Sequence, residues 1–325
     1  MKTHKRLWDD FIAMDNLRLA AKKAVKNKKA KHVVKRFLRH QDENLQKLQE
    51  SLINGTFTTS RYNIFKVYEP KEREIFVLPL FPDRVLQHAV INILGPIWQK
   101  LFIHDSYACI PNKGLHAASA RMMQFVRRNK YALQCDIRKF FPSIRHDIMM
   151  QILKRKISDK KMLKILDDIV RSSGGETNLP IGNLTSQWMG NLYLNDLDYF
   201  VKHTLHWRDY IRYCDDFCLL GNNKKELHAA GKKIKKFIAD ELGLEFSKCN
   251  LVPTSCGINF IGYRHFPRFV LLRRRGKNRI RRRINNIRKY NDNSYHAKCQ
   301  IASALGWMKW ACSFNFRKSL KLDKE

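Results

Sequence analysis

Three carboxylates in this sequence stand at the ends of apolar segments, where side chains can converge on a ligand. Two are adjacent, in Tyr213-Cys214-Asp215-Asp216-Phe217, and the third, Asp136, ends an apolar run that begins at Tyr131. Mg²⁺ prefers oxygen ligands and is usually bound by one or two carboxylates together with substrate phosphates. Two such ions, about 3.5–4 Å apart, stabilise the attacking and leaving oxygens of an in-line displacement. The three acids therefore predict a two-magnesium phosphoryl-transfer site.

The segments around the adjacent acids predict a hairpin. Tyr210-Ile211-Arg212-Tyr213 and Phe217-Cys218-Leu219-Leu220 are short aromatic and aliphatic runs that are typical of strands. Asp tolerates the backbone angles of a tight turn, so both acids are expected at the turn. Taken alone, the pair is equally consistent with an ordinary Asp-Asp turn. The third acid, at the end of another strand, favours the catalytic interpretation.

The composition favours a nucleic-acid partner. The chain has 325 residues, 44% of them hydrophobic, and 63 Lys and Arg against 29 Asp and Glu give a formal net charge of +34. The apolar content supports a folded core, and such a field attracts a polyanion, with nucleic acid ahead of an anionic membrane. No apolar run has the length of a membrane span. Asp9 and Asp10 interrupt any signal-peptide core, so we expect a cytoplasmic protein.

The cysteines do not predict a metal site. None of the eight forms a Cys-x-x-Cys pair, and Cys214 and Cys218 fall on opposite sides of the expected turn. The default expectation is scattered, reduced and mostly buried thiols in an intracellular protein.

The C-terminal tail is the most basic part of the chain. Residues 266–325 carry 17 Lys and Arg against three acids. Charge this dense repels itself without a polyanion, so a run of basic residues here is expected to bind nucleic acid. That run consists of Arg273, Arg274, Arg275, Lys277, Arg279, Arg281, Arg282 and Arg283. The interleaved aromatics Trp307, Trp310, Phe314 and Phe316 are interpreted as the core of a small helical domain.

The order of four segments resembles the reverse transcriptases of bacteria, phages and group II introns. The segments are Asp136 to Phe141, Leu179-Pro180-x-Gly182, Tyr213-x-Asp215-Asp216 and Gly257-x-x-Phe260-x-Gly262, and the resemblance runs from about Tyr62 to Tyr263. It implies an α+β, right-hand polymerase fold. A basic helical extension (1–60) would precede the fingers (61–130). The palm (131–265), an antiparallel sheet packed on helices, would carry a fingers insertion near 149–178, and a small, basic, helical thumb (266–325) would follow.

One departure from the family pattern points to a subtype. The usual sequence after Leu-Pro is Gln-Gly-x-x-x-Ser-Pro, whereas this chain has Ile181-Gly182-Asn183-Leu184-Thr185-Ser186-Gln187. With both Gln and Pro replaced, the chain resembles the enzymes of diversity-generating retroelements. Those enzymes copy a template RNA into cDNA with errors at template adenines. The cDNA then replaces a repeat in a target gene, a process called mutagenic retrohoming. The resemblance implies this low-fidelity activity for a bacterial or phage-encoded protein.

The resemblance also assigns metal and nucleotide contacts. Asp136 and Asp215 would hold two Mg²⁺ ions, for which Mn²⁺ is a substitute, with the Ile137 carbonyl and Asp216 completing the set. The nucleotide would meet Lys71 and Arg73 at its triphosphate, Phe141 at its 2′ position, Ile181 and Gly182 near the nascent pair, and Lys248 near the pyrophosphate. Relatives often carry Arg where this chain has Ile110, so Lys113 or Lys71 would compensate.

The implied partners are a template RNA, a cDNA or primer, dNTPs, and a small basic helical-bundle accessory protein. Two alternatives stay open. One is a retron, defence-associated or group II intron reverse transcriptase, and the other is a non-catalytic RNA-binding protein on the same scaffold.

Overall fold

The computed structural model describes residues 3–68 and 72–322, and these form two compact units. The first takes in the described residues up to Ile103, together with Ile137–Phe200 and Lys236–Glu245. The second takes in His104–Asp136, Val201–Lys235 and the described residues from Phe246 onward.

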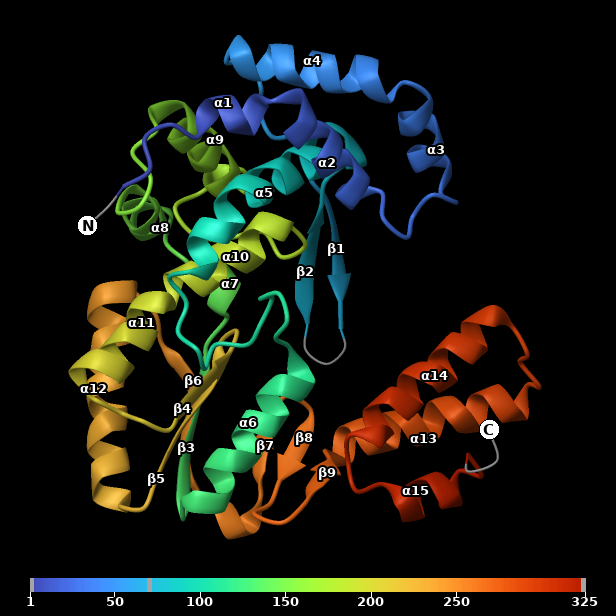
Figure 1. The fold of residues 1–325 in the computed structure, drawn as a ribbon. Helices are drawn as coiled ribbons and strands as arrows, with labels where there is room; N and C mark the ends of the chain where they lie inside the picture. Colours follow the sequence, from blue (N-terminus) through green and yellow to red (C-terminus); the bar gives the residue numbers. More distant parts are fainter. Residues whose placement is uncertain (1–2, 69–71, 323–325) are drawn as a thin grey trace. The chain divides into compact units, whose positions relative to one another are not determined.

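The first unit is mainly helical (Figure 1). Leu38, Leu45, Leu48 and Leu52 recur at near-helical spacing in the sequence, which predicts a helix. The last three are buried along one helix, whereas Leu38 belongs to the helix before it and is 36% exposed. No helix in the described part of the chain combines the length and apolar character needed to cross a bilayer. The helices are α1 (Trp8–Ile12), α2 (Met14–Ala24), α3 (His32–Arg39), α4 (Gln41–Ile53), the π-helical turn η1 (Leu80–Arg84), α5 (Val85–Gln99), α7 (Phe140–Ser143), α8 (His146–Lys154), α9 (Lys160–Arg171), α10 (Leu184–Tyr193) and α11 (Asn195–Tyr199).

A two-stranded hairpin in this unit pairs with the loop that follows Leu179-Pro180. Its antiparallel strands are β1 (Asn63–Val67) and β2 (Arg73–Val77). The Phe76 amide donates to the Ile181 carbonyl at 2.8 Å. Gly182 has φ +126°, and an added Cβ would lie 2.3 Å from the Phe76 carbonyl oxygen. The close approach that we expected between Gly182 and a ligand is thus made to the protein's own backbone.

The second unit is built on a four-stranded sheet with the order β4-β5-β3-β6. The strands are β3 (Tyr131–Ile137, of which Ile137 belongs to the first unit), β4 (Tyr210–Tyr213), β5 (Asp216–Gly221) and β6 (Phe246–Pro253). β5 pairs antiparallel with both β3 and β4. The helix α6 (Leu115–Arg128) covers one face, where its apolar side chains share a core with Ala132, Ile211 and Leu220. On the other face, Gly231 of α12 (Lys224–Leu242) fits against Leu133.

The apolar residues of Gly257-Ile258-Asn259-Phe260-Ile261-Gly262-Tyr263 predict a strand, but the segment is instead part of a hairpin. The strands β7 (Ile258–Phe260) and β8 (Tyr263–His265) are antiparallel, and β9 (Val270–Leu272) pairs with β8. Ile261 and Gly262 have φ +46° and +87°, which turn the chain between them. A single strand was wrong because these positive φ angles are incompatible with extended backbone.

The tail forms a helical subdomain within the second unit (Figure 1). Its helices are α13 (Arg274–Lys289), α14 (Tyr295–Lys309) and α15 (Phe314–Ser319). Of the four aromatics expected in its core, only Phe316 is there, with Ile284 and Met308. Phe314 is 65% exposed. Trp307 and Trp310 pack outside the helical core, so the prediction was correct for one residue of four.

Trp307 and Trp310 attach this subdomain to α6 and β8. The Trp310 ring stacks on His116 at 4.9 Å and 14°, and its Nε1 donates to Ser119 Oγ at 2.7 Å. Ser119 Oγ is in turn 2.7 Å from His265 Nε2. Gly262 has no side chain at the point where a Cβ would meet the Trp307 ring at 2.7 Å. The helical tail is therefore anchored by directed polar and ring contacts.

We predict that Trp310→Phe destabilises the protein by about 1 kcal/mol, because the ring stack is kept while one partly buried hydrogen bond is lost. Denaturant unfolding of wild type and variant would measure the difference. Phe314→Ala is the matched control, since its ring is mostly exposed and its removal is expected to stay within about 0.5 kcal/mol. Equal stability of wild type and Trp310→Phe would contradict the anchoring role.

Candidate active site

The structure brings the three acids together at one end of the four-stranded sheet. Asp136 of β3 is paired in register with Asp216 of β5, and Asp216 is paired with Tyr213 of β4. Such partners have Cα atoms about 4.5–5.5 Å apart and side chains on the same face. Cys214 and Asp215 form the connection between β4 and β5, and Cys214 has the left-handed φ of +54° that two-residue hairpins use. The predicted hairpin is confirmed, with Asp215 in its turn and Asp216 opening β5.

Burial and neighbouring charges perturb Asp216. Burial raises the pKa of Asp216 to about 7, and the negative charges of Asp136 and Asp215 contribute to the increase. Arg273 and Lys248 act in the opposite direction on the same carboxyl. Burial and like charges disfavour the ionised form of a carboxyl. A bound cation therefore stabilises that ionised form strongly. Arg273, predicted as a nucleic-acid contact, therefore lies within electrostatic reach of the acids.

Ser247 and Arg212 hold the acid-bearing backbone and were not predicted. Ser247 Oγ donates to Asp136 Oδ2 at 2.5 Å. Arg212 is fully buried, and its Nη1 donates to the Cys214 carbonyl at 3.1 Å. The sequence signal for Arg212 was a charged residue inside an apolar strand, which must find partners. Ser247 gave no local signal, because its partner is 111 residues away.

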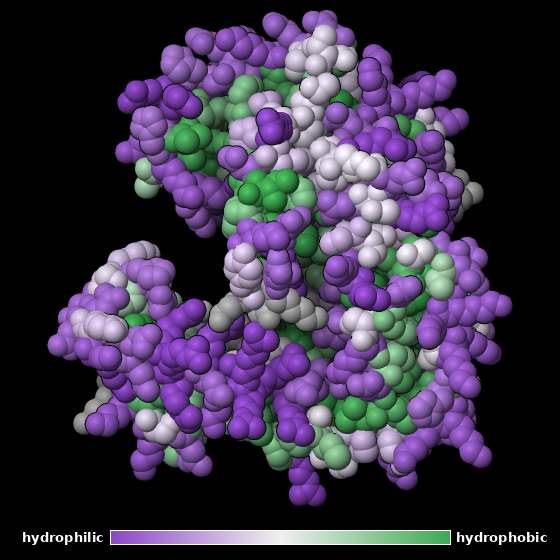
Figure 2. Space-filling view, turned by 180° about the vertical axis from the view of Figure 1, so that it is seen from behind, coloured by the Kyte–Doolittle hydropathy of each residue, from purple (hydrophilic) through white to green (hydrophobic). Residues whose placement is uncertain are grey.

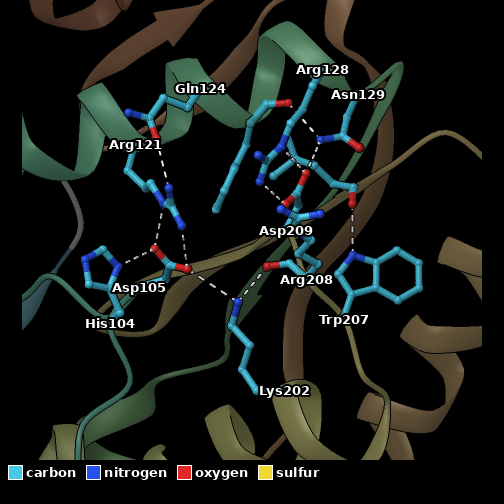
Figure 3. Close-up of polar contacts among 12 residues, drawn as sticks. His104, Asp105, Arg121, Gln124, Arg128, Asn129, Lys202, Trp207, Arg208 and Asp209 are labelled. Carbon is cyan, nitrogen blue, oxygen red and sulfur yellow. Dashed lines mark hydrogen bonds and ion pairs between the residues drawn. The ribbon is translucent and has the colours of Figure 1, made fainter.

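A polar network next to β4 fixes the neighbouring segment (Figure 3). Asp105 accepts from Arg121 Nε at 2.8 Å and from Lys202 Nζ at 3.4 Å, while His104 Nδ1 lies 3.2 Å away. Burial alone would raise the pKa of Asp105, but the hydrogen bonds from Arg121 and His104 and the charge of Lys202 lower it overall. The Arg212 amide donates to the Asp105 carbonyl at 2.9 Å. The network thus supports the strand that leads into the turn.

A second carboxylate in the same view anchors the opposite end of the sheet (Figure 3). Asp209 accepts from Arg128 Nε at 2.7 Å and from Asn129 Nδ2 at 2.6 Å. The Leu220 amide donates to the Asp209 carbonyl at 2.8 Å. β4 and β5 are therefore tied to the end of α6, away from the hairpin turn.

Lys113 and Ile110 have structural neighbours in the second unit. Lys113 Nζ donates to the carbonyls of His104 and Ser106 at 2.5 and 3.1 Å, and Ile110 is buried. The amine that we expected to compensate for Ile110 therefore stabilises the 104–106 segment. Its contact with a triphosphate stays a prediction.

Lys248 lies in the second unit, and the other predicted nucleotide contacts belong to the first unit. Arg73 opens β2 and is exposed, and Phe141 is partly exposed beside Gly190, where an added Cβ would lie 3.2 Å from its ring. Ile181 is partly exposed, and the Ile137 side chain is buried. Lys71 lies outside the described residues.

The basic run on α13 splits into two groups. Lys277 Nζ lies 4.9 Å from the centre of the Phe316 ring and the Arg281 guanidinium lies 5.6 Å from it, so both pack on the subdomain core. The remaining helix members are exposed, namely Arg274, Arg275, Arg279, Arg282 and Arg283. Figure 2 shows mainly hydrophilic side chains over this subdomain. An exposed cationic helix face of this kind suits a phosphate backbone.

The donor set suits a metal shared with a substrate rather than a closed protein cage. Among the described residues, no three His, Cys, Asp or Glu side chains form a ready metal-binding group. Mg²⁺ needs only one or two carboxylates when substrate phosphates supply further oxygens. The like charges of Asp136 and Asp215 around the buried Asp216 carboxyl fit a site of that type.

Comparison with known proteins identifies the family. Residues 70–265 match the family described as reverse transcriptase (RNA-dependent DNA polymerase). The chain is 22% identical over 270 residues to protein YkfC of Escherichia coli K12. The aligned region covers 68% of this chain and 70% of YkfC. It is 27% identical over 171 residues to the group II intron-encoded protein LtrA of Lactococcus lactis, 49% of this chain and 28% of LtrA. The retron Ec73 reverse transcriptase of Escherichia coli is 26% identical over 182 residues, 51% of this chain and 56% of that enzyme.

Solved structures show the same architecture. The telomerase of Candida albicans, in complex with a fragment of telomeric RNA, matches with a TM-score of 0.50 and 11% identity, over 70% of this chain and 50% of that one. Apo telomerase of Candida tropicalis matches with a TM-score of 0.50 and 13% identity, over 66% and 48%. At these identities the likeness shows the fold alone, and it confirms the predicted α+β right-hand polymerase fold.

The chain belongs to the reverse transcriptase family, since the family match covers more than half of its length. The class of enzyme is thus RNA-directed DNA polymerase, as the sequence predicted. It spans 28% of LtrA and about half of each telomerase chain. The boundaries given for fingers, palm and thumb stay predictions.

We predict that Asp216→Asn stabilises the metal-free protein more at pH 8 than at pH 5. With a folded-state pKa of about 7 against an ordinary 3.8, the native carboxyl keeps a proton that the unfolded chain has released, so its stability contribution falls as pH rises between those values. Asn cannot ionise, and the expected extra gain at pH 8 is on the order of 1–2 kcal/mol.

Denaturant unfolding in a chelator at both pH values measures this difference. Asp147→Asn is the control, because the hydrogen bond and charge of Arg145 lower the pKa of that exposed carboxyl. A gain from Asp216→Asn that is equal at both pH values, or larger at pH 5, would show that the carboxyl titrates normally.

Proposed function

We propose that this chain copies a template RNA into cDNA with two Mg²⁺ ions held by Asp136, Asp215, Asp216 and the Ile137 carbonyl. The single observation that carries the proposal is the pairing of Asp136 with Asp216 beside Asp215 in a chain of the reverse transcriptase family. When bound, the ions supply charge stabilisation for the attacking and leaving oxygens of the displacement. Template RNA, a primer and dNTPs are the substrates of this proposal.

The chain's own groups position and neutralise rather than form covalent bonds, as is general for phosphoryl transfer. Ser247 fixes the orientation of the Asp136 carboxylate. Arg212 holds the turn that carries Asp215 through the Cys214 carbonyl. The charge of Lys248 acts on Asp216, which is consistent with a role near the departing pyrophosphate. The same acids would give a purely RNA-binding protein no advantage, because they repel an RNA backbone.

We predict that Asp215→Ala lowers primer extension on an RNA template about 10³-fold or more, since a lost metal ligand removes several kcal/mol of charge stabilisation. Primer extension with dNTPs and Mg²⁺ measures the effect, and Mn²⁺ is tested in parallel. Asp147→Ala is the matched control, because that acid is exposed and paired with Arg145. Extension by Asp215→Ala at the wild-type rate would exclude the assigned role, and RNA binding without extension by wild type would favour the non-catalytic alternative.

The diversity-generating subtype is the finer part of the proposal. It is supported by Ile181 and Gln187, which replace the usual Gln and Pro of the family pattern. Ile181 contributes its carbonyl to the Phe76 amide, and its side chain has no hydrogen-bonding group for the nascent pair. The proposal includes a small basic helical-bundle accessory protein. The retron and group II intron relatives fit the alternative subtypes equally. A nearby pair of repeats that differ at adenines would favour the diversity-generating subtype.

We predict that Ile181→Gln lowers misincorporation opposite template adenine about 5-fold or more. An added amide contact worth about 1–3 kcal/mol raises discrimination roughly 5- to 150-fold. Sequencing of cDNA made by wild type and variant measures the error spectrum, with Ile181→Val as the apolar control. If Ile181→Gln leaves the adenine errors unchanged, another residue determines fidelity.

A further inference from the structure

Four of the eight cysteines form two thiol–thiol contacts in the second unit. Cys135 Sγ of β3 lies 3.4 Å from Cys249 Sγ of β6. The thiols of Cys109 and Cys214 are also hydrogen-bonded to each other. In each pair one thiol belongs to an exposed residue, Cys249 or Cys109, and the other to a more buried one. Our expectation of mostly buried thiols was wrong, since only Cys135 and Cys218 are buried.

Both contacts adjoin the acids of the proposed active site. Cys135 directly precedes Asp136, and Cys214 directly precedes Asp215 in the hairpin turn. Cys249 follows Lys248, whose charge acts on Asp216. Each strand end that carries a principal metal ligand is therefore one residue from a thiol with a second thiol in contact.

We propose that the pairs Cys135–Cys249 and Cys109–Cys214 are modification sites for hydroperoxides, which convert each dithiol to a disulfide and thereby switch off polymerisation. The inference rests on the proposed function only for its effect on activity. An exposed thiol with a resolving thiol beside it is the arrangement that redox-sensing cysteines share.

The chemistry balances with the peroxide as the oxidant. The exposed thiolate, Cys249 or Cys109, attacks one peroxide oxygen, the O–O bond breaks, and a sulfenic acid forms with release of hydroxide. The neighbouring thiol, Cys135 or Cys214, then attacks the sulfenic sulfur, and an S–S bond forms as the sulfenic hydroxyl leaves as water. Two thiols lose two electrons, and one hydroperoxide group gains them.

The contacts distinguish the two members of each pair. The hydrogen bond from Cys214 lowers the pKa of Cys109 to about 7, and that from Cys135 lowers the pKa of Cys249. The exposed thiol is thus the nucleophile that a peroxide can reach, and the more buried thiol beside it resolves the intermediate.

Disulfide formation would displace the acids. The sulfur atoms of Cys135 and Cys249 must close from 3.4 Å to about 2.05 Å. β3 and β6 then shift relative to each other, and the hydrogen bond of 2.5 Å between Ser247 and Asp136 crosses the same pair of strands. A displacement of about 1 Å in catalytic geometry costs on the order of 100-fold in rate. A Cys109–Cys214 disulfide would constrain the turn at Asp215 in the same way.

The test uses the full chain with hydrogen peroxide, then dithiothreitol, and two readouts. Primer extension reports activity, and peptide mapping by mass spectrometry reports which cysteines are joined, independently of activity. The double variant Cys109→Ser/Cys249→Ser removes the exposed thiol of each pair. Cys256→Ser/Cys312→Ser is the matched control, because these cysteines are exposed and make no thiol contact within the described residues. Each single variant, Cys109→Ser or Cys249→Ser, separates the contributions of the two pairs.

We expect peroxide to lower wild-type extension on the order of 100-fold, with recovery on reduction, and both predicted disulfides to be mapped. The control variant should respond like wild type, and Cys109→Ser/Cys249→Ser should stay active. Peroxide sensitivity that persists in that variant, or a map without either disulfide, would overturn the inference. If the disulfides form but untreated wild type makes no cDNA, the proposed function fails and the modification sites stand.

Discussion

Repulsion among three carboxylates is the constraint on which the second unit depends. Asp136 and Asp216 are fixed opposite each other by strand register, and Asp215 follows from the turn, so the chain cannot relax their charges by moving one side chain away. Burial, together with the charges of Asp136 and Asp215, raises the pKa of Asp216. Without ligands such a cluster only destabilises the fold, whereas the divalent cations and substrate phosphates of the proposed function would turn the same charges into binding energy. The high positive charge of the chain does not remove this repulsion, because distance and salt screening keep most of that positive charge from acting on the acids.

Several polar contacts hold the backbone that bears the acids against this repulsion. Arg212 satisfies the Cys214 carbonyl from within the sheet, and Ser247 reaches Asp136 from the neighbouring strand. Asp105 connects β4 to Arg121 of α6. Arg212 and Asp105 are buried and costly to leave without partners, so they specify one arrangement of the strand ends. Precision in the proposed site thus comes from polar contacts placed behind the acids.

The acids and the hairpin could be predicted because their signal is local. Apolar strand runs that end in Asp136 and Asp215 report both the strand and its ligand-bearing end. The turn at Ile261 could not be predicted, because Ile rarely adopts φ +46°. Gly182 was recognised as a site of close approach, but its neighbour, the Phe76 carbonyl, is set by tertiary pairing over a long sequence separation. The thiol contacts were missed for the same reason, since Cys135 and Cys249 meet only after β3 and β6 pair.

Because side chains alternate along a strand, the proposed metal ligand Asp136 and the thiol of Cys135 lie on opposite faces of the sheet. Ala132 and Asp136 lie on the α6 face of the sheet, since Ala132 is in the core with that helix and side chains alternate along β3. Leu133 and Cys135 must then lie on the opposite face, where Gly231 of α12 approaches both Leu133 and Cys249 Sγ. A disulfide there would not touch a metal ion or a substrate on the other face. Its effect on Asp136 would have to pass through the shared peptide backbone, where a closing of the strands moves every residue of the pair. A close-packed sheet transmits such a shift because it has no voids to absorb it.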